Sequence, residues 1–383
     1  MDTQIKASED FNVSFSILLR RDLFVNFLFN VTGFLGSYIF NVFKKLGYCR
    51  ILITILLYIN MNCENLYGQG VNMTGLEKTW ELYESPLKTK NYIKTFKALT
   101  VKNSQGIRLP IAINYFLNEA NAQKKQHFIT LLKTLIIHHK KETPLILAYF
   151  NSKLTQDNFE QEAKTIAKNW VELLKLIQPL LQENFPLLVE IVNEPTIYPK
   201  EWRTAASIIK HIQDYDASQD IIVGASNYNS MYELSRLDPL SFDHLIYSFH
   251  FYEPFIFTHQ GTRWTGAQNS TLGLPFPFQK NKDSLPALAR QALGTPGETN
   301  YYEYEHTGTH KAIQDKLNII SNWKQKHNVE VWCTEYGVTK NADISSRTNY
   351  INSVTKSLKN LDIPGYIWEW EGNFGVKSLR IFE

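Results

Sequence analysis

Short apolar runs alternate with helical patterns along the chain from residue 68 onward, and this alternation limits the fold more than any other feature. The runs are rich in branched residues, as strands buried on both faces are, and the segments between them carry apolar residues at helical spacing. Strands that alternate with helices form a parallel sheet, and eight such units close into a barrel. The sequence therefore predicts an α/β fold, a single (β/α)8 or TIM barrel over residues 68–383. The predicted strands are 70–73, 106–113, 145–150, 187–192, 221–226, 245–252, 329–338 and 365–370, and the helical faces lie near 92–99, 128–136, 163–177, 202–212, 313–320 and 351–361.

The first 67 residues differ from this pattern. The uncharged run 23–43 has basic residues on both sides and is long enough to span a bilayer, and the run 51–59 resembles the core of a signal peptide. We expect residues 1–67 to be a hydrophobic leader that makes the protein secreted or membrane-anchored, with membrane association through residues 23–59. A cytosolic helical cap and an integral membrane protein are the alternatives.

Composition excludes some partners. Net charge is +3, hydrophobic residues make up 44% and charged residues 20%, and no basic run is dense enough to bind nucleic acid. The spacing of Cys49, Cys63 and Cys333 indicates neither a disulfide framework nor a metal site, and Cys333 is expected to be a small core residue. We expect no metal, no organic cofactor and a monomer.

Two predicted strands end in a glutamate. Pro186–Thr196 (PLLVEIVNEPT) carries Glu194 at its tip, and Val329–Val338 (VEVWCTEYGV) carries Glu335. Pro195 cannot extend a strand ladder and favours extended backbone at Glu194. In a parallel barrel the carboxyl ends of the strands hold the active site. Such a glutamate pair is what acid–base and nucleophilic chemistry on a sugar bond requires; surface carboxylates are the alternative.

Further polar residues stand within the predicted strands. Arg108 stands between apolar residues, where it is either a structural ion-pair partner or a site residue. Glu190 is expected to face inward, so Arg108 would be shared between Glu190 and Glu335. His250 and Tyr252 lie on one strand face, which favours a role in the site over that of a core histidine.

Five pieces of sequence occur in order at predicted strand ends: Arg108 in IRLPI, Asn193-Glu194-Pro195, His250-Phe251-Tyr252, Thr334-Glu335-Tyr336-Gly337 and Trp368 in YIWEWEGNFG. Together they resemble glycoside hydrolase family 5, also called cellulase family A, within the clan of retaining barrel glycosidases. The resemblance extends over the whole predicted barrel.

The resemblance implies a double displacement. Glu194 would be the acid/base and Glu335 the nucleophile, with Arg108 and the hydroxyl of Tyr252 as hydrogen-bond donors to Glu335. One glutamate must be protonated while its neighbour is charged.

The resemblance also implies contacts with the sugar. Asn193 would hold the 2-hydroxyl, His250 would bind in the same subsite, and the sugar ring would stack on Trp368. Trp370 shares the strand parity of Trp368 and is the alternative stacking residue.

The connection Glu253–Thr309 is the longest, and its His259 and Trp264 could line a substrate cleft or belong to a plain loop. Few residues follow the eighth strand, so the last helix is expected to be short or missing. The third strand departs from the family pattern because Tyr149 and Asn151 stand where a histidine is usual, which leaves the substrate open.

The sequence therefore predicts an endo-acting β-1,4-glucanase that binds a β-linked polysaccharide or oligosaccharide. A β-mannanase or another β-glucanase is the alternative within the family. A catalytically silent carbohydrate-binding barrel is the alternative of another class.

Overall fold

The structure is a computed structural model that describes residues 69–77, 86–101, 106–118, 122–139, 142–197 and 203–379. Within these residues the strands form a closed parallel barrel in sequence order, which confirms the predicted (β/α)8 fold. The strands are β1 (Gln69–Asn72), β2 (Ile107–Ile111), β3 (Leu145–Tyr149), β4 (Leu187–Glu190), β5 (Asp220–Gly224), β6 (Leu245–Phe251), β7 (Glu330–Tyr336) and β8 (Gly365–Ile367).

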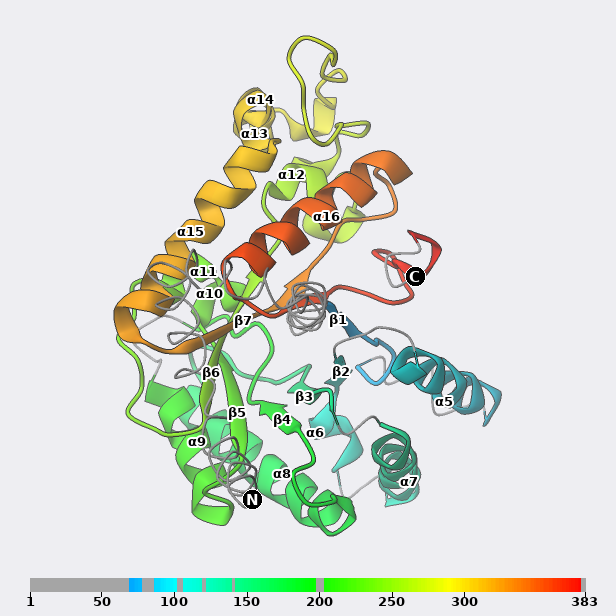
Figure 1. Ribbon diagram of the computed structural model, residues 1–383, viewed down its shortest axis with the longest axis vertical. Coiled ribbons are helices and arrows are strands. Elements are labelled where there is room, and N and C mark those ends of the chain that lie inside the picture. The colour runs from blue at the N-terminus through cyan, green and yellow to red at the C-terminus, as the bar shows by residue number, and fades with distance from the viewer. Residues whose placement is uncertain are drawn as a thin grey trace, which may run out of the picture. The chain divides into compact units, whose positions relative to one another are not determined.

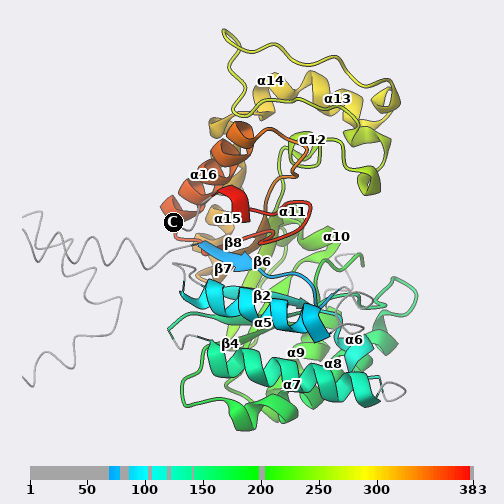
Figure 2. The same cartoon turned by 90° about the vertical axis from the view of Figure 1, so that its right-hand side faces the viewer.

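Helices cover the outside of this barrel (Figures 1 and 2). The longer ones are α5 (Pro86–Val101), α7 (Ala122–His138), α8 (Phe159–Ile177), α9 (Arg203–Tyr215), α15 (His310–His327) and α16 (Ile344–Asn360). Between β5 and β6 the structure has only the short α10 (Ser226–Asn229) and α11 (Met231–Leu234), and a short 3-10 helix, Lys377–Leu379, follows β8. A short α6 (Ile113–Phe116) follows β2.

The predicted leader over residues 1–67, including the run 23–59, lies outside the described residues, as does residue 202 of the predicted helical face 202–212. None of the helices in the described part of the chain combines the length and the apolar character needed to cross a bilayer.

Alternate residues of the strands serve two different cores. On β2, Ile107, Leu109 and Ile111 face the helices and join the main hydrophobic core, whereas Arg108 faces the barrel interior. The interior below Arg108 is closed by a separate apolar cluster made of Ile146, Leu188, Ile222, Ile246, Trp332 and Tyr366. The barrel is therefore packed at its amino end and polar toward the carboxyl ends of its strands.

Strand β7 contains an irregularity that redirects one side chain. Its pairing with β6 shifts register, so that Phe249 lies opposite Cys333 and His250 lies opposite Glu335. Strict alternation would turn Trp332 and Glu335 to opposite faces, because they are three residues apart. An extra residue in one strand changes this alternation. Both side chains consequently face the interior.

The predicted long connection Glu253–Thr309 is ordered structure rather than plain loop. It lies beyond the barrel beside α15 and α16 in both views (Figures 1 and 2). Phe257, Phe276 and Tyr304 pack against Tyr350 of α16 or against one another. Its elements are α12 (Phe255–Thr258), α13 (Pro296–Tyr302), α14 (Tyr304–Thr307) and 3-10 turns at Arg263–Thr265, Ala267–Asn269 and Arg290–Ala292.

Candidate active site

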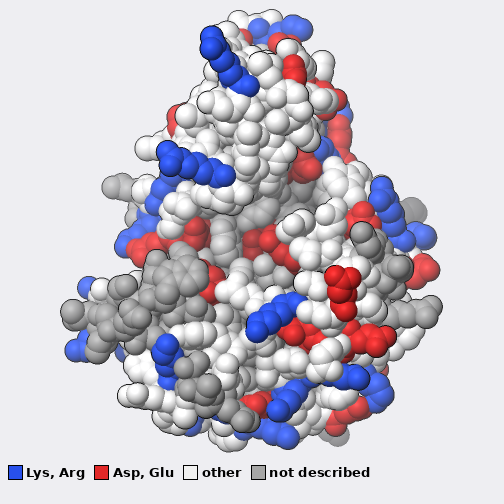
Figure 3. All heavy atoms as spheres, turned by 180° about the vertical axis from the view of Figure 1, so that it is seen from behind, with Lys and Arg blue, Asp and Glu red and all other residues white. Residues whose placement is uncertain are grey.

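A cleft of about 820 Å³ opens at the carboxyl ends of the strands. Figure 3 views this side of the molecule and shows a hollow across its middle, with acidic side chains along it. The predicted residues that line the cleft are Asn193, Glu194, His250, Tyr252, His259, Trp264, Glu335 and Trp368. Arg108 and Glu190 lie beneath this lining, fully buried.

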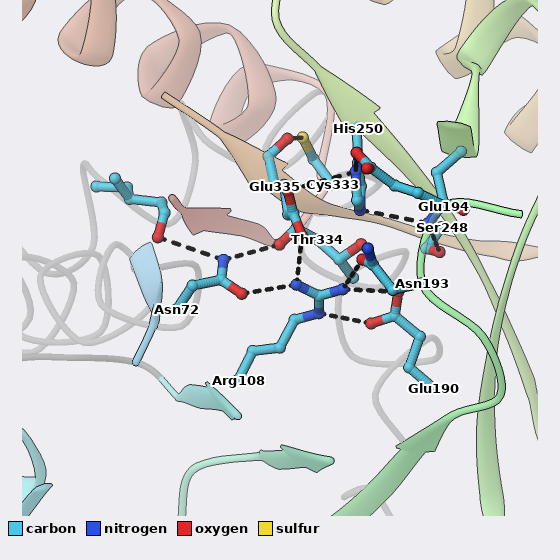
Figure 4. Close-up of polar contacts among 12 residues, drawn as sticks. Asn72, Arg108, Glu190, Asn193, Glu194, Ser248, His250, Cys333, Thr334 and Glu335 are labelled. Atoms are coloured by element: carbon cyan, nitrogen blue, oxygen red, sulfur yellow. Dashed lines mark hydrogen bonds and ion pairs between the residues drawn. The ribbon is translucent and has the colours of Figure 1, made fainter. Parts of the chain in front are cut away.

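Arg108 is the centre of the buried polar group (Figure 4). Its Nε and Nη2 donate to the two carboxylate oxygens of Glu190 at 2.6 and 2.9 Å. Nη1 donates to Oδ1 of Asn72 and to Oε1 of Glu335, both at 2.7 Å, and Nη2 donates to Oδ1 of Asn193 at 2.7 Å. All five N–H groups of the guanidinium therefore have an acceptor.

The charge of Arg108 is shared between two carboxylates, as expected from the sequence. Burial opposes the charged guanidinium, but the carboxylates of Glu190 and Glu335 outweigh it and raise the pKa of Arg108. The bidentate pair with Glu190 fixes the plane of the guanidinium. The remaining N–H groups are thereby aimed at Glu335 and Asn193, so Arg108 has both a structural and a site role.

Glu335 is almost completely enclosed, with 5% of its side chain exposed. Oε1 accepts from Arg108, and Oε2 accepts from the hydroxyl of Tyr252 at 2.8 Å. Burial raises the pKa of Glu335; the charges of His250 and Arg108 act in the opposite direction. Burial and the charge of Glu335 raise the pKa of Tyr252 well above its ordinary value. The phenol thus stays protonated and donates to the carboxylate.

Glu194 lies in a different environment, with 33% of its side chain exposed. Strand β4 ends at Glu190, so Glu194 follows the strand by four residues instead of closing it. The expected extended backbone is wrong, because Glu194 has a φ of 46°, in the left-handed region. Two hydrogen bonds beside it hold this conformation, from Asn193 N to the carbonyl of Tyr149 and from Arg108 to Asn193 Oδ1.

The two glutamates face each other across His250. One oxygen of each carboxylate and a nitrogen of His250 all lie within 4.8 Å of one another. Nδ1 of His250 is 2.7 Å from Oε1 of Glu194 and 3.5 Å from Oε2 of Glu335. In the part of the chain that the structure describes, this is the one cluster of His, Cys, Asp and Glu donors close enough to hold a metal ion. The 2.7 Å between Nδ1 of His250 and Oε1 of Glu194 is the length of a direct hydrogen bond.

His250 is buried between these charges. Burial lowers its pKa, but the carboxylates of Glu335 and Glu194 outweigh burial, and the net direction is upward. Its other nitrogen, Nε2, lies 3.3 Å from Nδ2 of Asn229. His250 therefore bridges the glutamate pair and a buried amide (Figure 4 shows the pair).

Trp368 lines the cleft, whereas Trp370 is buried in the hydrophobic core. The alternative assignment of Trp370 as the stacking residue is therefore not supported by its position. Strand β8 ends at Ile367, so strand parity does not extend to Trp370. Trp368 stacks on Phe150, with ring centroids 5.9 Å apart and planes 4° from parallel.

The end of the third strand presents Phe150 to the cleft, and neither Tyr149 nor Asn151 does so. Tyr149 is fully buried on the helix side, where its hydroxyl bonds Asn114 and Asn169. Asn151 is exposed and donates to the carbonyl of Glu77. The ring of Phe150 also lies 5.3 Å from the guanidinium of Arg108.

The connection after β6 supplies one wall of the cleft. His259 stacks on Phe255 at 3.9 Å and meets Tyr252 and Phe374 edge-on. Burial lowers the pKa of His259 to about 3, so it is neutral at physiological pH. Trp264 is 61% exposed and lies 6.4 Å from Phe374, with its ring available to the cleft.

Three residues of the site were missed by the sequence analysis: Asn72, Phe150 and Asn229. Asn72 accepts from Arg108 and donates to the carbonyls of Thr334 and Ile367. Strand parity along β1 could have shown that Asn72 faces the barrel interior. Cys333, by contrast, is fully buried as expected.

A closed parallel barrel with two glutamates facing each other at its carboxyl end is the architecture of the barrel glycoside hydrolases. The family model for cellulase (glycosyl hydrolase family 5) matches residues 64–374. The chain therefore belongs to glycosyl hydrolase family 5.

The chain is also similar to individual proteins that are named endoglucanases. The chain is 26% identical to Endoglucanase 3 of Fibrobacter succinogenes over 362 residues, which are 85% of this chain and 52% of that protein. It is 26% identical to Endoglucanase C of Acetivibrio thermocellus over 212 residues, 53% of this chain and 60% of that protein. The chain thus spans about half the length of the curated relatives it matches.

Solved structures share the fold. The cellulose synthase subunit Z of Clostridioides difficile matches with a TM-score of 0.63 and 19% identity over 81% of this chain and 94% of that one. The endoglucanase Cel5A of Thermotoga maritima matches with a TM-score of 0.63 and 18% identity over 83% and 94%.

Proposed function

We propose that this protein is a retaining glycoside hydrolase in which Glu194 is the acid/base and Glu335 the nucleophile. The observation that carries the proposal is the separation of the two carboxylates, whose nearest oxygens lie within 4.8 Å. Retaining enzymes hold their carboxyl groups about 5 Å apart, whereas inverting enzymes need about 6.5–9.5 Å to admit a water molecule.

In the first step, an oxygen of Glu335 attacks the anomeric carbon of the sugar. The bond from that carbon to the glycosidic oxygen breaks, and the proton of Glu194 moves to the departing oxygen. Glu335 is suited to attack because Arg108 and Tyr252 hold one oxygen each and so fix the carboxylate toward the cleft. The product of this step is a glycosyl-enzyme ester on Glu335.

In the second step, Glu194 removes a proton from a water molecule while that water attacks the anomeric carbon. The ester bond breaks and Glu335 returns to its carboxylate form. The partial exposure of Glu194 supports this role, because water must reach it, whereas Glu335 is enclosed. Two inversions at carbon leave the product with the configuration of the substrate.

The remaining residues would position the sugar. Oδ1 of Asn193 is occupied by Arg108, so its amide N–H groups are left to donate, in the proposal to the 2-hydroxyl. Trp368 would carry the sugar ring on its face, and Trp264 would contact a neighbouring sugar unit. His250 would stay close to the reacting centre through its hydrogen bond to Glu194.

The proposed substrate is a β-1,4-linked glucan that is cut internally. Two relatives carry the name endoglucanase, which supports this choice. β-Mannan is the second candidate, because the structurally similar Cel5A of Thermotoga maritima has been solved with mannotriose as well as with cellobiose. The silent binding barrel is disfavoured by the close glutamate pair, in which Arg108 and Tyr252 hold Glu335 and His250 holds Glu194, because binding alone does not require such an arrangement.

We also propose that residues 1–67 direct the protein out of the cytoplasm, because the enzyme would encounter a polymeric glucan outside the cell membrane. Fractionation of cells that express the whole chain tests this. Protein in the cytoplasmic fraction alone would contradict it.

The function is tested by release of reducing ends from soluble β-glucans, mannan and xylan by the full chain. We expect release from a glucan, loss of turnover in Glu335→Gln, and activity of Glu194→Ala only on substrates with activated leaving groups. Release from mannan alone would keep the mechanism and replace the substrate. If Glu335→Gln released reducing ends at the rate of the unaltered enzyme, the mechanism would be refuted.

A further inference from the structure

A turn of left-handed backbone lies directly beside the glutamate pair, and the proposed function assigns it no role. Asn227 and Tyr228 have φ and ψ near 53° and 57°, and 61° and 47°, and Asn229 has a φ of 53°. Left-handed conformations are costly for residues other than glycine, and least so for asparagine. Three in succession persist only when their surroundings hold them.

The surroundings are parts of the site itself. The backbone N–H of Tyr228 donates to the carbonyl of Pro195 at 3.3 Å, directly after Glu194. Ser230 pairs with His250 as an isolated parallel bridge. Gly224 makes room for the turn, since a Cβ atom there would lie 2.4 Å from the side-chain amide of Asn229.

The result is one fully buried side chain aimed at His250. Nδ2 of Asn229 lies 3.3 Å from Nε2 of His250 and 3.5 Å from Oγ of Ser248, whereas Oδ1 has no hydrogen-bond partner. With the amide nitrogen turned toward the ring, its N–H group donates and Nε2 accepts. The ring proton of neutral His250 is then on Nδ1, which donates to Glu194.

Other groups around His250 act on its protonation in both directions. The carboxylates of Glu194 and Glu335 favour a second proton on the ring, and Arg108 opposes it. Tyr252 meets the ring edge-on and donates to Glu335. The amide of Asn229 offers a donor where a second ring proton would need an acceptor.

We propose that Asn229 is a positioning residue whose buried amide holds His250 neutral and protonated on Nδ1. This role rests on the proposed function, because it concerns the proton of the acid/base. A doubly protonated His250 would place a full positive charge 2.7 Å from Glu194 and so favour loss of the proton that the first step needs. A neutral ring donates one hydrogen bond and leaves that proton available.

The first test measures the tautomer of His250 in the unaltered protein. The whole protein is labelled with ¹⁵N-histidine, and the signals of His250 are assigned by their loss in His250→Gln. Above its titration midpoint, His250 is expected to show a protonated Nδ1 and an unprotonated Nε2. The opposite tautomer, which is the common one in free histidine, would overturn the proposal.

The second test changes the partner of Nε2. Asn229→Asp keeps the shape and tolerates left-handed backbone, but it offers a negative acceptor. We expect the titration midpoint of His250 to rise by at least one pH unit and the basic limb of kcat/KM to move to lower pH. Asn227→Asp is the matched control, since it adds the same charge in the same turn at an exposed position.

A midpoint shift in Asn229→Asp no larger than in Asn227→Asp would contradict the role of Asn229. The tautomer and the midpoint are measured without turnover. Failure of the proposed function, seen as absence of glycan cleavage by the unaltered protein, is therefore distinguishable from failure of this inference. If Asn229→Asp does not fold, the tautomer of the unaltered protein still decides the matter.

Discussion

The floor and the wall of the cleft are built in different ways. The floor, made of Asn72, Arg108, Glu190 and Glu335, comes from strands, is buried, and joins its side chains by hydrogen bonds of 2.6–2.9 Å. The wall, formed by Glu253–Thr309 where it faces the cleft, comes from one long connection and places aromatic rings beside open space.

The floor and the wall therefore have different functions. The floor fixes the orientation of one carboxylate and has no freedom to adapt, because each donor of Arg108 is already used. The wall can change its exposed rings without disturbing the barrel, since Trp264 is 61% exposed. We therefore expect changes in the floor to affect folding and turnover together, and changes in the wall to affect substrate binding or the pH dependence of stability.

Removal of the guanidinium from the floor is expected to have the largest effect. In Arg108→Met, Glu190 and Glu335 stay buried without their donor, so the free energy of unfolding should fall by about 3–5 kcal/mol. Turnover should disappear. Urea unfolding and reducing-end release measure the two effects.

The double variant Arg108→Met/Glu190→Gln is the matched control. It removes one of the two buried charges left behind, so part of the lost stability should return while turnover stays absent. If Arg108→Met alone were as stable as the unaltered protein, the floor would not be held by Arg108.

In the wall, the protonation of His259 affects stability. The pKa of His259 is lowered to about 3 by burial, against an ordinary value of 6.5. The unfolded chain binds the proton more readily, so the contribution of neutral His259 is present above pH 6.5 and is lost as pH falls below it. Between pH 6 and pH 4 this loss is roughly 2–3 kcal/mol, from about 1.4 kcal/mol per pH unit.

His259→Phe keeps a ring between Phe255 and Phe374 but cannot take up a proton. Its stability should therefore fall less steeply between pH 6 and pH 4 than that of the unaltered protein, as measured by urea unfolding at several pH values. Parallel stability curves for the two proteins would disprove the assignment.

The smallest expected effect concerns the rim of the wall. Trp264→Ala should raise KM several-fold, about 1 kcal/mol, with kcat unchanged, because a stacking face is lost in the ground state and the transition state alike. Tyr302→Ala is the matched control, since Tyr302 is 66% exposed on the same connection but does not line the cleft. Equal effects of the two variants on KM would remove Trp264 from the substrate path.

The sequence predicted the barrel and most of the floor for a physical reason. Apolar runs of strand length reveal buried parallel strands, and parity predicted that Glu190 faces inward and that His250 and Tyr252 share a face. The site role of Arg108 came from the family resemblance. These inferences depend on local periodicity, which short regular strands preserve.

The remaining features depend on irregular backbone, which periodicity does not report. Glu335 faces inward because β7 shifts register, and Glu194 lies in a left-handed turn beyond β4. Trp370 enters the core because β8 ends before it. Asn229 belongs to a short segment without any repeating pattern, so its approach to His250 was visible only in three dimensions.

In the proposed mechanism Glu335, held by Arg108 and Tyr252, forms a covalent bond with the sugar. The most direct measurement is mass spectrometry of the whole protein after exposure to a 2-deoxy-2-fluoro cellobioside with an activated leaving group, followed by peptide mapping. We expect one added glycosyl unit, attached to Glu335. A label on another residue, or an active enzyme that accumulates no adduct and releases product of inverted configuration, would contradict it.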